Sequence, residues 1–133
     1  MALKKAIAAI ITVLAVTMGI LADANAASVT VKCETRGTTR SKISVDGTGL
    51  VGTYYALVYS PGSIPSTVQS KASKTAVSGE VEFDFDSNPA DIAAGATKIS
   101  PTFIKNHTVI GQIRRTSDKV LFGSMKVTNC AAK

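Results

Sequence analysis

Glu80-Val81-Glu82-Phe83-Asp84-Phe85-Asp86 is the stretch that decides the fold class, because acidic and apolar residues alternate through it without a break. Successive side chains of a β-strand point to opposite faces, so the alternation predicts a half-buried strand. Val81, Phe83 and Phe85 are therefore expected in the core. The four acids are expected to face water, since an unpaired buried carboxylate is costly.

Strand-like patterns and turn residues continue on both sides of this stretch. The run 51–60 is apolar on both faces, which is typical of a central strand. The predicted strands are residues 29–34, 42–46, 51–60, 67–77, 80–86, 108–115 and 119–128. Seven short strands in about 107 residues predict an all-β fold, a single antiparallel β-sandwich of immunoglobulin-like architecture. A small β-barrel is the alternative.

Two short helical turns and one bulge complete the predicted fold. Asn88 is a helix-capping residue and the following proline suits a first helical position, so Pro89–Ala94 is predicted as a helical turn that ends at Gly95. A second such turn is predicted to begin at Ser100-Pro101. In the last strand the apolar alternation slips by one residue, which a β-bulge at Gly123 would explain.

The first 26 residues have the three-part order of a secretory signal peptide. Lys4 and Lys5 precede an uncharged apolar run at 6–21, and Ala24-Asn25-Ala26 is a small-x-small triplet. Sixteen helical residues span roughly 24 Å, which is short of the roughly 30 Å hydrocarbon core of a membrane. The sequence therefore predicts a cleaved leader at 1–26, one domain at 27–133, and a secreted or periplasmic protein.

The two cysteines are the only ones in the chain. An exported protein meets an oxidising compartment, so Cys33 and Cys130 are expected to form a disulfide. This bridge would close almost the whole domain into one loop.

The sequence offers little for catalysis or for metal binding. His107 is the only histidine and lies in an expected loop, and no nucleophile or zinc motif surrounds it. Asp84, Asp86 and Asn88 have the spacing of the start of a calcium loop, but Pro89 stands where glycine is needed. We therefore expect no enzyme, no cofactor and no metal, with these three residues as a weak candidate.

Charge is unevenly distributed along a chain whose net charge is +6. Five acids lie between Glu80 and Asp91, whereas basic residues gather near both ends. The candidate binding residues are Lys32, Arg36, Arg40, Lys42, Arg114, Arg115, Lys119 and Lys126. If the disulfide places the end strands side by side, the two groups could merge into one basic face for an anionic partner.

We therefore expect an exported, non-catalytic binding or structural module whose basic face holds an anionic envelope polymer or another protein. One alternative is a self-assembling subunit of an extracellular fibre or matrix, with residues 27–32 as a donor strand. Another is a small inhibitor of a secreted enzyme that acts through a loop such as Ser60–Ser66. An exported chain has little occasion to meet nucleic acid, and no apolar run after residue 26 is long enough to span a membrane.

Overall fold

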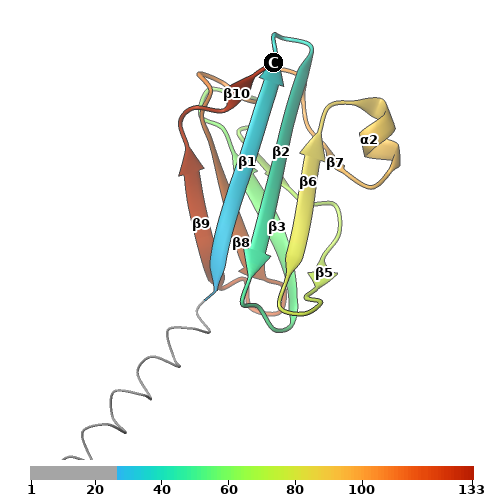
Figure 1. The fold of residues 1–133 in the computed structure, drawn as a ribbon, viewed down its shortest axis with the longest axis vertical. Coiled ribbons are helices and arrows are strands. Elements are labelled where there is room, and N and C mark those ends of the chain that lie inside the picture. The colour runs from blue at the N-terminus through green and yellow to red at the C-terminus, as the bar shows by residue number, and fades with distance from the viewer. Residues whose placement is uncertain (1–26) are drawn as a thin grey trace, which may run out of the picture.

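Two β-sheets pack face to face in the computed structural model, which describes residues 27–133 (Figure 1). The predicted signal peptide, residues 1–26, lies outside the described residues. Within residues 27–133, no helix is long and apolar enough to cross a membrane.

The first sheet, which we call sheet A, has the strand order β10-β1-β2-β6-β7. Its strands are β1 (Ser28–Arg36), β2 (Arg40–Thr48), β6 (Val81–Asp86), β7 (Thr97–Lys98) and β10 (Ala131–Ala132). β1 and β2 pair antiparallel over their whole length, and β6 pairs antiparallel with residues 42–47 of β2. The two short strands cover only one end of the edges, because β10 pairs with Glu34 and Thr35 and β7 pairs with Phe85 and Asp86.

The second sheet, sheet B, has the order β4-β3-β8-β9, and β5 pairs with the first residues of β3. Its strands are β3 (Thr53–Tyr59), β4 (Thr67–Gln69), β5 (Lys74–Thr75), β8 (Val109–Arg115) and β9 (Leu121–Val127). All of its pairings are antiparallel. The predicted strand 67–77 is thus two short edge strands, and the run 51–60 yields the central strand β3.

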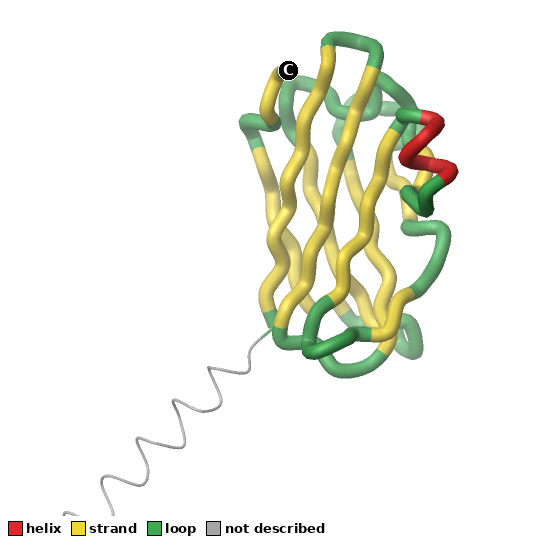
Figure 2. The backbone as a smooth tube through the Cα atoms, turned by 45° about the vertical axis from the view of Figure 1, so that its right-hand side comes forward, coloured by secondary structure: helices red, strands yellow, loops and turns green. Residues whose placement is uncertain are grey.

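The all-β, sandwich-like class predicted from the sequence is confirmed, with corrections to its details. The described strands form two separate sheets and do not close into a barrel. The sandwich is not purely antiparallel, because β10 runs parallel to β1 and β7 runs parallel to β6. β7 follows β6 after the helix drawn in red in Figure 2, whereas β10 follows β9 of sheet B and joins the opposite edge of sheet A.

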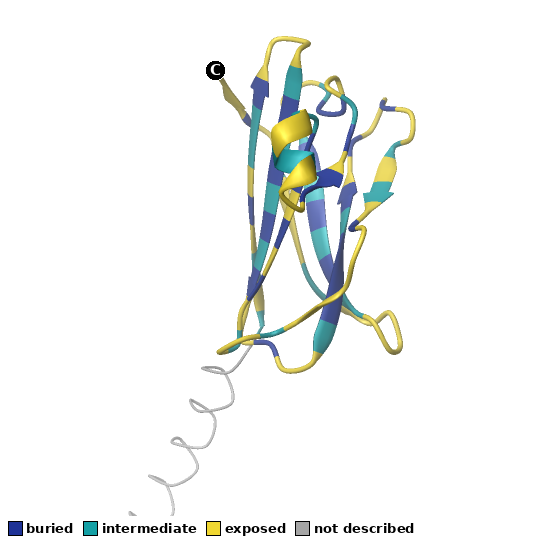
Figure 3. Ribbon diagram, turned by 90° about the vertical axis from the view of Figure 1, so that its right-hand side faces the viewer, coloured by how far each residue is buried: buried dark blue, intermediate teal, exposed yellow. Residues whose placement is uncertain are grey.

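The core lies between the sheets and is built from the inward residues of each strand (Figure 3). Val81, Phe83 and Phe85 are buried, as their alternation predicts. The sheets approach closely at Gly111, where an added Cβ would lie 2.6 Å from Cγ2 of Val31. A side chain at this position would collide with sheet A, so glycine is required by the packing.

The buried position of Asp86 corrects the expectation that all four acids of residues 80–86 face water. Glu82 and Asp84 are exposed, but Asp86 is only 1% exposed. Its carboxylate receives two hydrogen bonds from Arg40, 46 residues earlier in the chain, at 3.0 and 2.8 Å. The charge is therefore compensated inside the protein, which removes the cost on which the expectation rested.

The helical turn after β6 forms as predicted, and the second one does not. The helix α2 spans Pro89–Ala93, and the Asn88 side chain accepts hydrogen bonds from the backbone N–H groups of Ala90 and Asp91. After Ser100 the chain makes a hydrogen-bonded turn, in which the Phe103 N–H donates to the Ser100 carbonyl, rather than a helix. Ser41 also holds this segment, since its Oγ donates to the Pro101 carbonyl at 2.8 Å.

The predicted bulge in the last strand occurs one residue before the expected position. Ile113 lies opposite Gly123 and Arg114 lies opposite Leu121, so Phe122 is the extra residue. Phe122 makes an edge-to-face contact with Tyr54, with ring centroids 5.2 Å apart. Gly123 is instead a place of close approach, because a Cβ there would collide with Val29.

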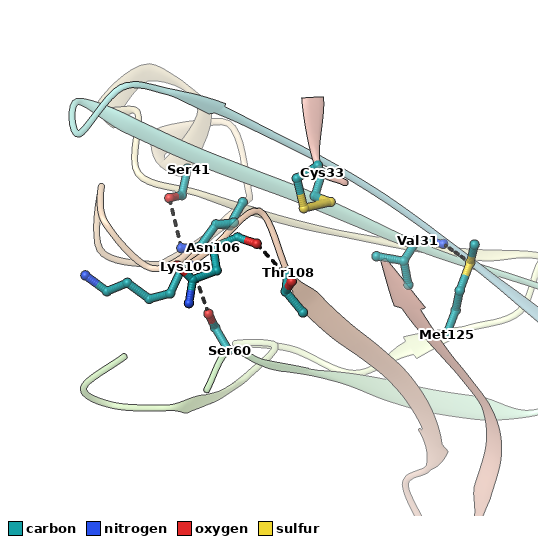
Figure 4. Close-up of a disulfide and its surroundings, with 10 residues drawn as sticks. Val31, Cys33, Ser41, Ser60, Lys105, Asn106, Thr108 and Met125 are labelled. Atoms are coloured by element: carbon teal, nitrogen blue, oxygen red, sulfur yellow. Dashed lines mark hydrogen bonds between the residues drawn. A yellow bond between two sulfur atoms is a disulfide. The ribbon is translucent and has the colours of Figure 1, made fainter. Parts of the chain in front are cut away.

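The predicted disulfide between Cys33 and Cys130 is confirmed, with a Cα–Cα distance of 4.9 Å (Figure 4). It ties β1 to the segment that leads into β10. The C-terminal segment thereby joins sheet A, whereas β9, the strand before it, belongs to sheet B.

Candidate functional site

The two layers of the sandwich differ sharply in charge. Sheet B with its loops, residues 50–79 and 104–130, is the basic layer, and its single acid is Asp118. The basic residues of this layer are Lys71, Lys74, Lys105, Arg114, Arg115, Lys119 and Lys126. Asp118 is already paired, with one carboxylate oxygen 2.6 Å from a guanidinium nitrogen of Arg115.

Sheet A with its loops contains charges of both signs in nearly equal number. Its basic residues are Lys32, Arg36, Arg40, Lys42, Lys98 and Lys133, and its acids are Glu34, Asp46, Glu80, Glu82, Asp84, Asp86 and Asp91. The predicted basic residues near the start of the chain therefore share a layer with seven of the eight acids of residues 27–133. Those near its end lie in the other layer.

The outer face of sheet B combines aromatic, amide and cationic side chains. Inward residues of β8, such as Val109 and Ile113, are fully buried, so Ile110, Gln112 and Arg114 point outward. Strand register places the outward residues of β3 beside them, because residues paired across neighbouring strands share a face. The outward pairs are Tyr55 with Arg114, Leu57 with Gln112, and Tyr59 with Ile110.

The same face extends over both edges of the sheet. Lys126 of β9 pairs with Ile110, and Gln69 of β4 pairs with Leu57. Tyr59 is 40% exposed, whereas Tyr55 is 8% exposed. The accessible aromatic ring of this face is therefore that of Tyr59, near the Lys126 end.

Arg114 is held against the sheet by neutral partners. Its Nε and Nη2 donate to Oε1 of Gln112 at 3.3 and 3.2 Å, and its Nη1 donates to the Lys119 carbonyl at 2.9 Å. A guanidinium has five N–H donors in a rigid fork. The contacts orient this fork without neutralising its charge, which leaves Arg114 suited to an anionic group.

The outer face of sheet A has a different arrangement, in which Lys32 and Lys42 lie among acids. Lys42 is flanked in register by Glu34 and Asp86, and Lys32 lies in the row of Ser44 and Asp84. These strands form the bottom of a shallow hollow of about 590 Å³. Gly95, which follows α2, and Lys133, near the C-terminus, border the hollow. Because charges of both signs line it, this hollow has no clear preference for an anion.

Arg40 has a structural position rather than a free one. Besides Asp86, its Nη2 contacts a carboxylate oxygen of Asp91 at 2.8 Å. Burial acts to raise the pKa of Asp86, but the hydrogen bond from Arg40 and those from the backbone at Asn88 and Ser87 outweigh it, so the net pKa lies below its usual value. The hydrogen bond with Asp86 likewise raises the pKa of Arg40.

The remaining predicted basic residues lie at the two ends of the sandwich. Arg36 ends β1 and is exposed, and Lys119 is exposed in the turn between β8 and β9. Arg115 contacts Asp118 and places its guanidinium 4.9 Å from the centre of the Phe122 ring. The hydrogen bond from Arg115 lowers the pKa of the Asp118 carboxyl.

Two of the three residues of the weak candidate for metal binding have their side-chain oxygens engaged within the protein. The Asp86 carboxylate is bonded to Arg40 and the Asn88 side chain caps α2, while Asp84 is exposed on β6. Within residues 27–133, no group of three or more His, Cys, Asp or Glu side chains is placed to hold a metal ion. His107 is exposed in the turn before β8, where its carbonyl accepts the Cys130 N–H.

Sequence reasoning did not single out Tyr59, Gln69 or Gln112 as site residues. The run 51–60 is apolar on both sides, so its sequence does not indicate which side faces outward. A single glutamine belongs to no sequence pattern that would mark it as a site residue. A signal was available in the alternation of Tyr55, Leu57 and Tyr59, which must share one side of a strand. Only the pairing with β8 places that side next to Arg114.

A scan against protein-family models finds no match to this chain, and searches of the curated proteins and of the solved structures find none either.

Proposed function

We propose that the protein is an exported, non-catalytic binding module of immunoglobulin-like architecture whose ligand is an anionic polysaccharide of the cell envelope. The ligand lies on the outer face of sheet B. The observation that supports this most is the charge difference between the layers, since sheet B presents Arg114 and Lys126 with no acid in any of its strands. An anionic chain on this face would meet no like charge there.

The neutral side chains of the face suit a sugar chain better than a bare anion. The exposed ring of Tyr59 offers a flat apolar surface, and aromatic side chains with one apolar and one polar part are common at binding surfaces. The amides of Gln69 and Gln112 both donate and accept hydrogen bonds, as sugar hydroxyls require. Arg114 is the group for a carboxylate or sulfate substituent.

The test measures the binding of a charged and of an uncharged polymer to the protein and to two double variants. Both variants change the net charge by the same amount. Dextran sulfate and dextran are titrated into the protein by calorimetry, each at low and at physiological salt. We expect binding to dextran sulfate alone, weakening as salt rises because exposed charges are screened beyond about 8 Å at physiological ionic strength. Arg114→Glu with Lys126→Glu should weaken it by about tenfold or more, equivalent to about 1.4 kcal/mol.

The control is Lys32→Glu with Lys42→Glu, which changes the net charge by the same amount on sheet A. It should retain most of the affinity if the ligand lies on sheet B. Equal losses in the two double variants would mean that net charge alone attracts the polymer. Binding by neither form of the polymer, or unchanged binding at high salt, would contradict the proposal.

A second candidate, a subunit of a fibre or matrix, is favoured by the edge of β1 that faces away from β2. On that side β10 pairs only with Glu34 and Thr35, so the first half of β1 has no hydrogen-bonded strand there, although β9 lies against it at Gly123 and Met125. There the Val31 N–H donates to the thioether sulfur of Met125 at 3.2 Å (Figure 4), a weak acceptor that a partner strand could displace. Met125→Ala should then increase self-association in sedimentation velocity, and a strictly monomeric variant would argue against assembly at this edge.

A further inference from the structure

Four aliphatic side chains are exposed at one end of the sandwich, the end at which β1 begins (Figure 1). Val51 is 89% exposed and Val77 is 75% exposed, and Val120 and Leu121 are each close to half exposed. They belong to the three connections at this end: the β2–β3 loop, the β5–β6 turn and the β8–β9 turn. We call these four residues the aliphatic tip.

The backbone hydrogen bonds fix the loops of the aliphatic tip against one another. The Leu50 N–H donates to the Gly79 carbonyl at 3.0 Å, and the Ala76 N–H donates to the Gly52 carbonyl at 2.8 Å. These two bonds bracket Val51 and place it opposite the turn that contains Val77. The third connection joins the same loop, because the Thr116 N–H donates to the Thr53 carbonyl at 3.0 Å.

Aliphatic residues at these positions are not needed for the turns. Turns favour Gly, Pro, Asn, Asp and Ser, each for a conformational reason that valine does not satisfy. Nor do the exposed valines contribute to the core, which Leu50 and Val81 close from inside at this end. Apolar side chains gathered on the surface indicate a place that meets an apolar partner.

The chain itself indicates the nature of that partner. Ser28, the first residue of β1, lies at the same end, and the apolar run 6–21 precedes it by six residues. Six residues span about 20 Å at most when fully extended. If the predicted leader enters a bilayer during export, the end of the domain that lies closest to that bilayer is therefore the one with the aliphatic tip.

We propose that the aliphatic tip is a membrane-docking surface that inserts Val51 and Val77 into the interface of a lipid bilayer. Apolar side chains bind there by burying their area at the boundary between headgroups and acyl chains, aided by cationic neighbours. Lys119 is exposed next to Val120 in the β8–β9 turn and can meet a lipid phosphate. The acids near the tip are Asp46, Glu80 and Glu82, which border the same hollow as Val77, and Asp118, which Arg115 pairs.

The aliphatic tip is distinct from the outer face of sheet B, so a membrane and a polysaccharide could be held at the same time. The tip would orient the domain end-on, with the sheets standing away from the bilayer. The docking rests on the export that the proposed function includes, but not on the polysaccharide site, so the docking and the polysaccharide binding can each fail without the other.

The absence of tryptophan from the chain provides a specific test. Val51→Trp, Val77→Trp and Ile64→Trp each introduce a single fluorophore at an exposed position. Ile64 is the matched control, because it is 95% exposed but lies in the β3–β4 loop at the opposite end. Each variant is expressed as the full chain, and the form that the host exports is purified. It is mixed with vesicles of phosphatidylcholine and phosphatidylglycerol, with and without bromine on the acyl chains.

We expect a blue shift of emission and quenching by the brominated acyl chains for Val51→Trp and Val77→Trp, and neither effect for Ile64→Trp. Quenching requires insertion, so a leader that merely tethers the domain near the surface would not produce it. No quenching at either valine position, or equal quenching at all three, would overturn the proposal. A blue shift that grows with protein concentration in the absence of vesicles would also overturn it, because the partner would then be a second copy of the chain.

A second measurement keeps the result independent of tryptophan. Val51→Asn combined with Val77→Asn should reduce the fraction of protein that floats with the vesicles by several-fold, whereas Ile64→Asn should leave it unchanged. Unchanged flotation of the double variant, with the fold verified by circular dichroism, would contradict docking through the tip.

Discussion

Sheet A and sheet B use their charged residues in opposite ways. In sheet A, acids and bases alternate across neighbouring strands, and the central group of Arg40, Asp86 and Asp91 fastens α2 to the sheet. In sheet B, the strands contain cations without acids, and Arg114 is oriented by an amide and a carbonyl rather than by a carboxylate. Charged residues therefore stabilise the fold in sheet A, whereas the cations of sheet B remain available to a ligand.

The largest effect should come from removing the covalent link within sheet A. Cys33→Ala with Cys130→Ala opens a loop of 97 residues and should lower the free energy of unfolding by about 4–5 kcal/mol in the chain-entropy account. Urea unfolding of the oxidised protein and of the double variant measures the difference. A loss below about 1 kcal/mol would show that sheet A is stable without the bridge between β1 and the segment that leads into β10.

The next effect should come from the buried carboxylate of sheet A. Asp86→Ala leaves Arg40 with only the partly exposed Asp91 as a partner, and it should cost about 3 kcal/mol, near the lower end for a broken buried pair. Asp84→Ala, two residues earlier on the exposed part of the same face, should change stability by less than about 0.5 kcal/mol. Similar losses in both variants would remove the distinction between structural and free charges in sheet A.

The same ion pair should give the stability a defined pH dependence. Because the pKa of Asp86 is lower in the folded protein than its ordinary value of 3.8, its stabilising contribution is complete above about pH 4. The contribution is lost as the pH falls through the lowered pKa, since the unfolded chain takes up the proton first. Urea unfolding between pH 7 and pH 2 should therefore show a smaller acid-induced loss for Asp86→Asn than for the unaltered protein, with Asp84→Asn as the control.

The smallest effect on stability is expected from sheet B. Arg114→Glu with Lys126→Glu should change the free energy of unfolding by less than about 1 kcal/mol, because both side chains lie on the outer face and neither pairs with an acid there. Thermal unfolding followed by circular dichroism measures this. A large loss would mean that the cations of sheet B also serve the fold, which would weaken the contrast between the layers.

Local patterns in the sequence were sufficient for the sandwich-like class, for β6 and for the cap of α2. The alternation of Val81, Phe83 and Phe85 is set by the period of a strand and needs no knowledge of its neighbours. The burial of Asp86 was missed because its partner is distant in sequence. The two parallel edge strands were missed because two-residue strands have no pattern to detect.

The arrangement of the candidate site depends even more on residues that are distant in sequence, so local patterns predicted it less well than the fold. The disulfide was expected to bring the basic residues of both chain ends together, and it does join the ends. However, the strand that it places beside β1 within sheet A is β10, while Arg114 and Lys126 belong to sheet B. Which charges share a face is decided by strand pairing across the whole chain, and the sequence alone does not specify that pairing.

The central claim, that sheet B rather than sheet A holds an anionic polysaccharide, is tested most directly by mapping the bound face residue by residue. The assigned amide spectrum of the labelled protein is recorded during a titration with dextran sulfate, and again with dextran. With dextran sulfate, we expect the largest chemical-shift changes at Tyr59, Gln112 and Lys126 and at their neighbours on β3, β8 and β9. With dextran, we expect no such changes. Changes concentrated on β1, β2 and β6, or spread evenly over both sheets, would contradict the claim.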